Sequence, residues 1–201
     1  MTEPIYDELE GSNLHPVRPE DEEEPAEGEP LPEEEPPDDD LAAQPTALSR
    51  RGADFITRFE GFRAQLYNDP VGHCTIGIGH LVHHGPCNGT EPDEFKRGIT
   101  RDRAFQLLLQ DTAEVAAAVH RRVRVPLTQP RFDALCSWGI NCGADVFRTS
   151  TLVRLLNTGD HASVPGQLAR WDKAGSPPRP VAGLTRRRRA EGRLYAEGIY
   201  E

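Results

Sequence analysis

The strongest constraint on the fold comes from the first 47 residues, which cannot supply a hydrophobic core. They hold 17 Asp and Glu residues and one Arg, and the run from Pro19 to Asp40 is almost entirely Glu, Asp and Pro. Such a segment buries too little apolar surface to offset the entropy that ordering its backbone would cost. We therefore predict a disordered acidic tail over residues 1–47, followed by one folded domain over residues 48–201.

The charge of the chain divides at the same boundary. Residues 1–47 carry a net charge of −16, while residues 48–201 hold 16 acidic residues against 22 Lys and Arg, a net charge of +6. Net charge constrains binding partners rather than the fold. A basic domain suits an anionic polymer. The tail has two open interpretations: a solubilising appendage, or a polyanion that lies on the basic domain and competes with an anionic substrate.

The spacing of apolar residues predicts an α+β fold, mainly helical with a small antiparallel β lobe. A short amphipathic helix is expected over 48–60. Strand formers and turn formers alternate over 62–82, which predicts a hairpin or meander, and a Gly- and Pro-containing loop follows over 83–99. Further on we expect a long helix from Thr100, helices from Thr128 to Gly143 and from Thr149 or Ser150 to Gly159, and short helices over 161–173 and 184–198.

The cysteines Cys74, Cys87, Cys136 and Cys142 constrain the chemistry only weakly. The N-terminus has no basic segment followed by an apolar one, so no signal peptide is expected and reduced thiols are the default. Histidines crowd the segment around Cys74 and Cys87, but their spacing matches no standard zinc pattern. We predict no metal and no cofactor. A Cys74–Cys87 disulfide formed after export remains an alternative.

Three side chains that could act together follow the first expected helix. Glu60 ends that helix, Asp69 lies nine residues later in an Asn-Asp-Pro turn, and Thr75 comes six residues after that, where a strand begins. A chain that leaves a helix and folds back as a hairpin can bring all three to one cleft. Hydrolysis of a glycosidic bond needs one protonated carboxyl group and one carboxylate opposite it.

The neighbours of the two acids suggest different roles. Glu60 lies between Phe59 and Phe62, an apolar setting that favours the protonated acid. Asp69, beside Asn68, is expected to remain solvated and ionised, and Thr75 would help it to hold an attacking water. Glu60, Asp69 and Thr75 are therefore the predicted catalytic residues.

The pattern Glu-Gly-x5-Tyr-x-Asp-x2-Gly-x2-Thr-x-Gly-x-Gly-His, from Glu60 to His80, resembles the signature of the T-even phage lysozyme family, glycoside hydrolase family 24. The spacing of its Glu, Asp and Thr agrees with the catalytic residues of that family. The resemblance covers about residues 48–198. Three later segments resemble the family in the same order: Leu135–Trp138 with Asn141–Gly143, Ser150–Leu152 with Leu156–Asn157, and Gly183–Arg188 with Glu191.

This resemblance implies a muramidase that hydrolyses the β-1,4 bond between N-acetylmuramic acid and N-acetylglucosamine with inversion. Related phage enzymes that are lytic transglycosylases lack the second carboxylate, so the presence of Asp69 and Thr75 favours hydrolysis. The substrate contacts of the family carry over to Leu81, Ile140 and Ser150. The partner implied is bacterial peptidoglycan, with no nucleic acid, no stable membrane association and a monomeric protein.

The same resemblance implies an endolysin that lyses its host. Because neither a signal peptide nor a stretch of about 20 apolar residues is present, we expect synthesis in the cytoplasm and release to the wall by another factor. Two alternatives remain: a catalytically silent peptidoglycan-binding or virion structural module, and a basic nucleic-acid binder, for which no motif is found.

Several further residues are expected to have structural roles. His80 would pair with an acid and stabilise the β lobe. Trp138 and Trp171 are expected in the core. The run from Arg186 to Arg189 is interpreted as a solvated helix face.

Overall fold

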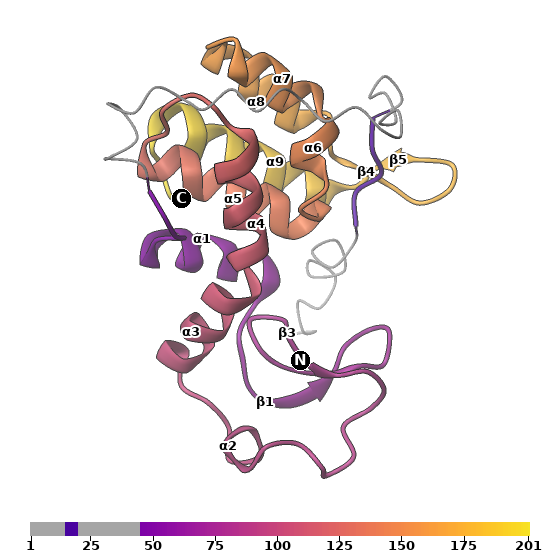
Figure 1. Ribbon diagram of the computed structural model, residues 1–201. Coiled ribbons are helices and arrows are strands. Elements are labelled where there is room, and N and C mark those ends of the chain that lie inside the picture. Colours follow the sequence, from indigo (N-terminus) through magenta and orange to yellow (C-terminus); the bar gives the residue numbers. More distant parts are fainter. Residues whose placement is uncertain (1–14, 20–44) are drawn as a thin grey trace, which may run out of the picture.

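The computed structural model describes residues 15–19 and 45–201. The described chain forms a larger helical lobe and a smaller lobe built around a three-stranded sheet, so the predicted α+β architecture is confirmed (Figure 1). The remaining residues of the predicted acidic tail lie outside the described ranges. In chain order the elements are α1 (Arg50–Glu60), β1 (Arg63–Asn68), β2 (Cys74–Gly77), β3 (His80–His83), α2 (Asp93–Lys96), α3 (Arg101–Asp111), α4 (Ala113–Arg122), α5 (Gln129–Cys142), α6 (Val146–Thr149), α7 (Thr151–Asn157), the 3-10 helix η2 (His161–Ser163), α8 (Val164–Ala169), β4 (Lys173–Ala174), β5 (Arg179–Pro180) and α9 (Ala182–Glu197).

The smaller lobe is an antiparallel meander in the order β1-β2-β3, as the alternating strand and turn formers predicted. Tyr67 on β1 is the partner of Thr75 on β2, and Thr75 is the partner of Leu81 on β3. Residues directly opposite each other on antiparallel strands share a face of the sheet. The three side chains therefore form one row across the sheet.

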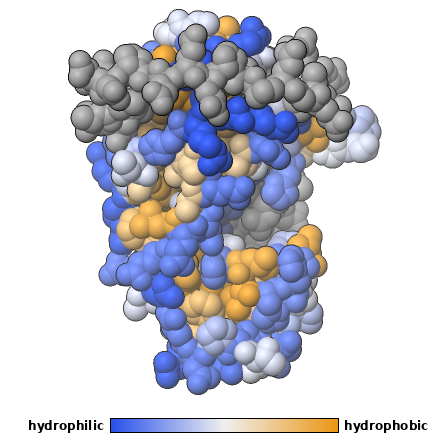
Figure 2. Space-filling view, in the orientation of Figure 1, coloured by the Kyte–Doolittle hydropathy of each residue, from blue (hydrophilic) through white to orange (hydrophobic). Residues whose placement is uncertain are grey.

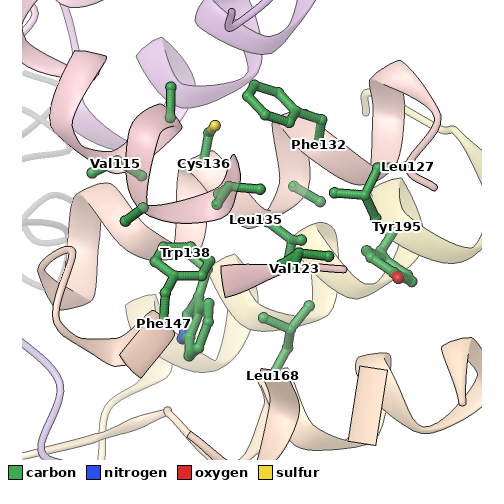
Figure 3. Close-up of a cluster of buried hydrophobic side chains, with 14 of the residues drawn as sticks. Val115, Val123, Leu127, Phe132, Leu135, Cys136, Trp138, Phe147, Leu168 and Tyr195 are labelled. Atoms are coloured by element: carbon green, nitrogen blue, oxygen red, sulfur yellow. The ribbon is translucent and has the colours of Figure 1, made fainter. Parts of the chain in front are cut away.

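Helix α5 forms the centre of the helical lobe, and most of its residues are buried. Figure 3 shows the apolar cluster around it, to which α4, α6, α8 and α9 also contribute. The Trp138 ring packs edge-on against Phe147 and Trp171, with centroid distances of 5.2 and 5.4 Å. The prediction that both tryptophans belong to the core is confirmed.

Helix α1 is fixed against α5 through the buried carboxylate of Asp133. Ser49 caps α1 by accepting a hydrogen bond from the Gly52 N–H, and its own N–H and hydroxyl group donate to Asp133. A Cβ at Gly52 would lie 2.6 Å from Asp133 Cγ, so this close approach requires glycine. These contacts fix the direction of α1, and Glu60 is its last residue.

The predicted long helix from Thr100 is divided into α3 and α4. Thr112 separates them with φ −88° and ψ −4°, and its hydroxyl group donates to the Leu109 carbonyl oxygen at 3.2 Å. Such back-bonding competes with the helical hydrogen-bond ladder and bends helices. Two further short features were not predicted: α2 inside the expected 83–99 loop, and the β4–β5 pair.

The prediction of a solvated face for Arg186–Arg189 is wrong for two of the four residues. Arg187 and Arg188 are each 1% exposed, whereas Arg186 and Arg189 are exposed. Helix α9 packs on α5 and α8 along the face that carries these two arginines and Glu191. Within the described residues, no helix is long and apolar enough to cross a membrane.

Candidate active site

Glu60 lies where α1 ends and the chain turns into the smaller lobe. Gly61 terminates the helix with a positive φ of 77°, and its N–H donates to the Thr57 carbonyl oxygen. Glycine readily adopts a positive φ after a helix, because it has no Cβ. The Glu60 side chain is 16% exposed, so it can reach the cleft while most of its surface is covered.

The carboxylate of Glu60 has a charged partner that the sequence interpretation missed. Arg187 Nη1 on α9 donates to Glu60 Oε1 at 2.5 Å, so the expectation of a mainly apolar setting for Glu60 is wrong. The same guanidinium group donates from Nε to Glu191 Oε1 at 3.1 Å and from Nη2 to the Ser137 carbonyl oxygen at 3.1 Å. Because this guanidinium group is bonded to three partners, it fixes the position of the Glu60 carboxyl group.

Charges balance in this buried cluster. Arg188 Nη1 lies 3.2 Å from Glu191 Oε2, so two guanidinium groups face two carboxylates. Burial by itself would lower the pKa of Arg187, but Glu60 and Glu191 outweigh that effect and leave the pKa raised. The sequence signal that could have revealed the cluster is the spacing of Arg187, Arg188 and Glu191, which are three and four residues apart on one helix face.

Asp69 occupies the turn between β1 and β2, as predicted. Its Oδ1 accepts hydrogen bonds from the N–H groups of Val71 at 3.0 Å and His73 at 2.7 Å. Two N–H donors stabilise the ionised form of a carboxylate. Oδ2 accepts no hydrogen bond from the described residues. Thr75 is 4% exposed, and its hydroxyl group donates to the His73 carbonyl oxygen at 3.2 Å, so Asp69 and Thr75 are fixed through the same turn.

Tyr67 connects the three predicted catalytic residues. Burial raises the pKa of Tyr67; Arg63 opposes this, and the negative charges of Asp69 and Glu60 raise it further. Both carboxylates therefore act electrostatically on one hydroxyl group. Thr75 is the direct strand partner of Tyr67. Tyr67, which belongs to the sequence motif but was not predicted as a site residue, therefore interacts electrostatically with Glu60 and Asp69 and pairs with Thr75 across the sheet.

A cavity of about 400 Å³ lies beside Glu60, between the two lobes. Ile140 lines it, which agrees with a substrate contact at that residue. Asp111 also lines it and accepts a hydrogen bond from His80 Nδ1 at 3.0 Å, so the predicted pairing of His80 with an acid is confirmed. Apolar side chains gather on the smaller lobe where it faces the larger one (Figure 2).

The other two predicted substrate contacts lie away from this cavity. Leu81 on β3 is 43% exposed and stands in the row of Thr75. Ser150 is buried at the start of α7, where its hydroxyl group accepts the Val153 N–H at 3.3 Å. It lines a separate cavity of about 620 Å³ that is bordered by four arginines: Arg122, Arg124, Arg148 and Arg154.

Cys74 and Cys87 form a disulfide, so the expectation of reduced thiols is wrong for this pair. The Cys74 N–H donates to the Gly85 carbonyl oxygen at 2.8 Å, which brings the following loop alongside β2 and the two Cα atoms to 4.7 Å. The alternative of a disulfide, left open above, is the one that the structure contains. Cys136 and Cys142 are free thiols in the helical lobe.

One group of side chains in the described part of the chain could hold a metal ion. Atoms of Cys74, His83 and Glu91 lie within 4.8 Å of one another. However, the Cys74 sulfur is bonded to Cys87 and offers no thiolate, which is the form that binds metals. The Glu91 carboxylate already accepts the N–H groups of Asn88 at 2.6 Å and Gly89 at 2.9 Å. These contacts assign the group to loop structure.

Hydrogen bonds from the backbone N–H groups of Glu91 itself and of Asn88 lower the pKa of Glu91 to about 2. Desolvation opposes this effect, and further hydrogen bonds from His83 and Gly89 add to it. The loop after β3 is therefore organised around a carboxylate that remains charged. Because β3 pairs with β2, this loop also supports the strand that carries Thr75.

A two-lobed α+β fold with a glutamate at the end of its first helix and an aspartate in the first turn of its sheet defines a lysozyme-like glycoside hydrolase. The sequence profile described as phage lysozyme matches residues 57–191. The endolysin of Acyrthosiphon pisum secondary endosymbiont phage 1 is 35% identical over 150 residues, which cover 74% of this chain and 97% of that protein. The chain belongs to the phage lysozyme family.

Solved structures agree with this assignment. The endolysin from Escherichia coli O157:H7 phage FAHEc1 matches with a TM-score of 0.66 and 33% identity, covering 77% of this chain and 96% of the other. The muramidase domain of SpmX from Asticaccaulis excentricus matches with a TM-score of 0.62 and 32% identity, covering 74% and 97%. In both comparisons almost the whole of the other chain is matched.

Proposed function

We propose that this protein is an endolysin of the T-even type, glycoside hydrolase family 24. It would hydrolyse the β-1,4 bond between N-acetylmuramic acid and N-acetylglucosamine in bacterial peptidoglycan and so lyse its host. The observation that carries the proposal is the convergence of Glu60 and Asp69 on Tyr67, whose pKa both carboxylates raise in addition to the effect of burial. Glycoside hydrolysis requires one carboxyl group and one carboxylate on opposite sides of the scissile bond. Glu60 lines the cavity, while Asp69 lies in the turn between β1 and β2, outside that lining.

Glu60 is the general acid in this mechanism. Arg187 holds its Oε1 in place, and the side chain borders the cavity. The protonated carboxyl group transfers its proton to the glycosidic oxygen as the bond to the sugar breaks.

Asp69 is the general base. Its Oδ1 is bound by two backbone N–H groups, which leaves Oδ2 to accept a proton from water. That water attacks the anomeric carbon from the face opposite the leaving oxygen, which inverts the configuration. Thr75, fixed through the same turn, helps to position the water.

Substrate binding in this proposal uses Ile140 in the cavity, Leu81 on the sheet and Ser150 at the second cavity. The net charge of +6 over residues 48–201 attracts the anionic wall. The protein would act as a monomer, without nucleic acid or stable membrane association. It would be made in the cytoplasm and would reach the wall by a route that another factor opens.

The test is digestion of purified peptidoglycan by the wild type, Glu60→Gln and Asp69→Asn, with soluble products identified by mass spectrometry. Asp111→Asn is the matched control, because Asp111 also borders the cavity but is paired with His80. Loss of a general acid typically costs about 10²–10⁴-fold in rate. We expect losses of that size for Glu60→Gln and Asp69→Asn, and a much smaller loss for Asp111→Asn.

The products distinguish the remaining possibilities. Muropeptides with reducing ends support hydrolysis and the roles of both acids. Anhydro-muropeptides would mean a transglycosylase and would remove Asp69 from the mechanism. Wall binding without products from any variant would support the catalytically silent module instead.

A further inference from the structure

A short piece of the N-terminal region lies against the folded domain. For residues 15–19 the prediction of disorder is wrong, because the Val17 N–H donates to the Lys173 carbonyl oxygen on β4 at 2.7 Å. His15 Nδ1 donates to the Asn141 carbonyl oxygen at the end of α5, at 3.2 Å. Pro19 is buried. In Figure 1 this indigo segment runs beside β4, along the side of the helical lobe.

His15 places this segment at the candidate active site. Its side chain lines the same cavity of about 400 Å³ as Glu60 and Ile140. His15, hydrogen-bonded to Asn141, therefore forms part of the wall of this cavity. A glycan that enters the cavity from the side of His15 has to compete with this side chain for space.

We propose that residues 15–19 form an autoinhibitory strap, an extended peptide ligand that the chain carries for its own cleft. The inference rests on the proposed function, because the strap competes with the glycan for the space beside Glu60. Main-chain hydrogen bonding of Val17 to β4 resembles the way in which extended peptides bind along a strand. A strap joined to the domain acts at the high effective concentration that a tether provides.

The contacts make the strap displaceable. Its anchors include the hydrogen bonds of Val17 and His15 and the buried Pro19, and each net hydrogen bond changes an equilibrium by about 2- to 12-fold. Only the molecules with an open cleft bind glycan, so the apparent affinity falls in proportion to their fraction. The strap therefore raises KM and leaves kcat unchanged, because a bound glycan has already displaced it.

This mechanism differs from electrostatic competition by the acidic residues of the tail. Attraction between that polyanion and the basic domain weakens as the Debye length falls from about 10 Å at 0.1 M salt to about 3 Å at 1 M. The hydrogen bonds of Val17 and His15 involve backbone partners and carry little salt dependence. Salt therefore separates the two explanations.

The experiment uses the full chain with two changes, His15→Ala and Val17→Pro. The first removes the imidazole, and the second removes the N–H that bonds to Lys173. The matched control is Val17→Ala, which keeps the N–H. With soluble, uncrosslinked glycan strands as substrate, we expect the double variant to lower KM by about 2- to 10-fold at both 0.1 M and 1 M salt, with kcat unchanged and the control close to wild type.

A second measurement does not depend on turnover. In the Glu60→Gln background the Val17 amide should be protected from hydrogen exchange, and saturating glycan strands should remove that protection.

Equal KM values for wild type and double variant, or an unprotected Val17 amide, would overturn the strap. KM values that are equal in wild type, double variant and Val17→Ala, and that fall together between 0.1 M and 1 M salt, would assign inhibition to the polyanion and also overturn it. A protected amide that glycan releases, with no turnover by wild type or double variant, would support the strap and reject the proposed hydrolase.

Discussion

The two lobes are stabilised in different ways. The helical lobe has a large continuous core, which includes Phe132, Leu135 and Trp138 on α5 (Figure 3). The buried core of the smaller lobe has five members: Ile76, Phe95, Ile99, Ala104 and Leu107. Because a small lobe buries little apolar surface, other devices must stabilise it. Here these are the Cys74–Cys87 disulfide and the hydrogen-bonded Glu91.

The same contrast applies to buried charge. In the helical lobe, Glu191 is fully buried and is balanced by two guanidinium groups. In the smaller lobe, Glu91 is 3% exposed and is satisfied mainly by backbone N–H groups. Glu191 is paired with side chains of its own helix, and the cluster reaches a distant part of the sequence through the pair of Arg187 with Glu60, whereas Glu91 is paired within its own loop. In the candidate active site, Glu60 belongs to the charge cluster of the helical lobe. Thr75 lies on β2, which pairs with β3, the strand that precedes the Glu91 loop.

The largest effect is expected from breaking the charge cluster in the helical lobe. Arg187→Ala leaves Glu191 buried with one partner fewer and frees Glu60 to rotate. Removing one partner of a buried ion pair typically costs about 3–5 kcal/mol. We expect a loss of that size in urea denaturation, together with a large loss of lytic activity.

Arg189→Ala is the matched control, since Arg189 lies two residues later on α9 and is exposed. Its effect should remain within about 0.5 kcal/mol. Equal effects of the two substitutions would contradict the assignment of Arg187 to the buried cluster.

Removing the disulfide should affect the smaller lobe selectively. The double variant Cys74→Ala with Cys87→Ala opens a loop with a sequence separation of 13. A closed loop of about 15 residues is stabilised by about 3 kcal/mol in the chain-entropy view. Hydrogen exchange should therefore quicken in β1–β3 while amides of α5 keep their protection. A uniform loss of protection in both lobes would show that the lobes unfold as one unit.

The substitution Glu91→Gln tests whether the Glu91 carboxylate contributes to the pH dependence of stability. The pKa of Glu91 is about 2 in the folded protein and 4.5 in the reference state. A lowered pKa contributes stability above the unfolded value, and that contribution is lost as pH falls from about 4.5 towards 2. The Tm of Glu91→Gln should therefore fall less steeply than that of the wild type over this range. Asp93→Asn, an exposed neighbour, is the control and should retain the wild-type slope.

Local patterns carried the sequence predictions that succeeded. Thr100 and Ser150 cap helices as predicted, and the meander over 62–82 followed from alternating strand and turn formers. The place of Asp69 in the turn between the first two strands followed from the same local pattern. Such features depend on neighbours within a few residues, and these neighbours can be read from the sequence.

The errors concern contacts between distant segments. Arg187 meets Glu60 across 127 positions, so its burial could not follow from a run of four arginines that looks solvated. Val17 meets Lys173 in a region whose composition alone indicated disorder. The Cys74–Cys87 bond required the position of Gly85 beside β2, which depends on strand register. In each case tertiary packing decided an outcome that composition favoured otherwise.

The smallest expected effect concerns the sulfur atoms, which again differ between the lobes. Burial raises the pKa of Cys142 to about 12, with Arg188 opposing it, and burial also raises the pKa of Cys136. With this pKa, only about one Cys142 in 10³ is ionised at pH 9, and the thiolate is the reactive form.

Native protein treated with iodoacetamide at that pH should therefore remain almost unlabelled in mass spectrometry. In urea without reductant it should gain two labels, and after reduction four. Four labels in urea without reductant would mean that Cys74 and Cys87 are not joined, and the smaller lobe would then depend on the hydrogen-bonded Glu91 loop and its small apolar core.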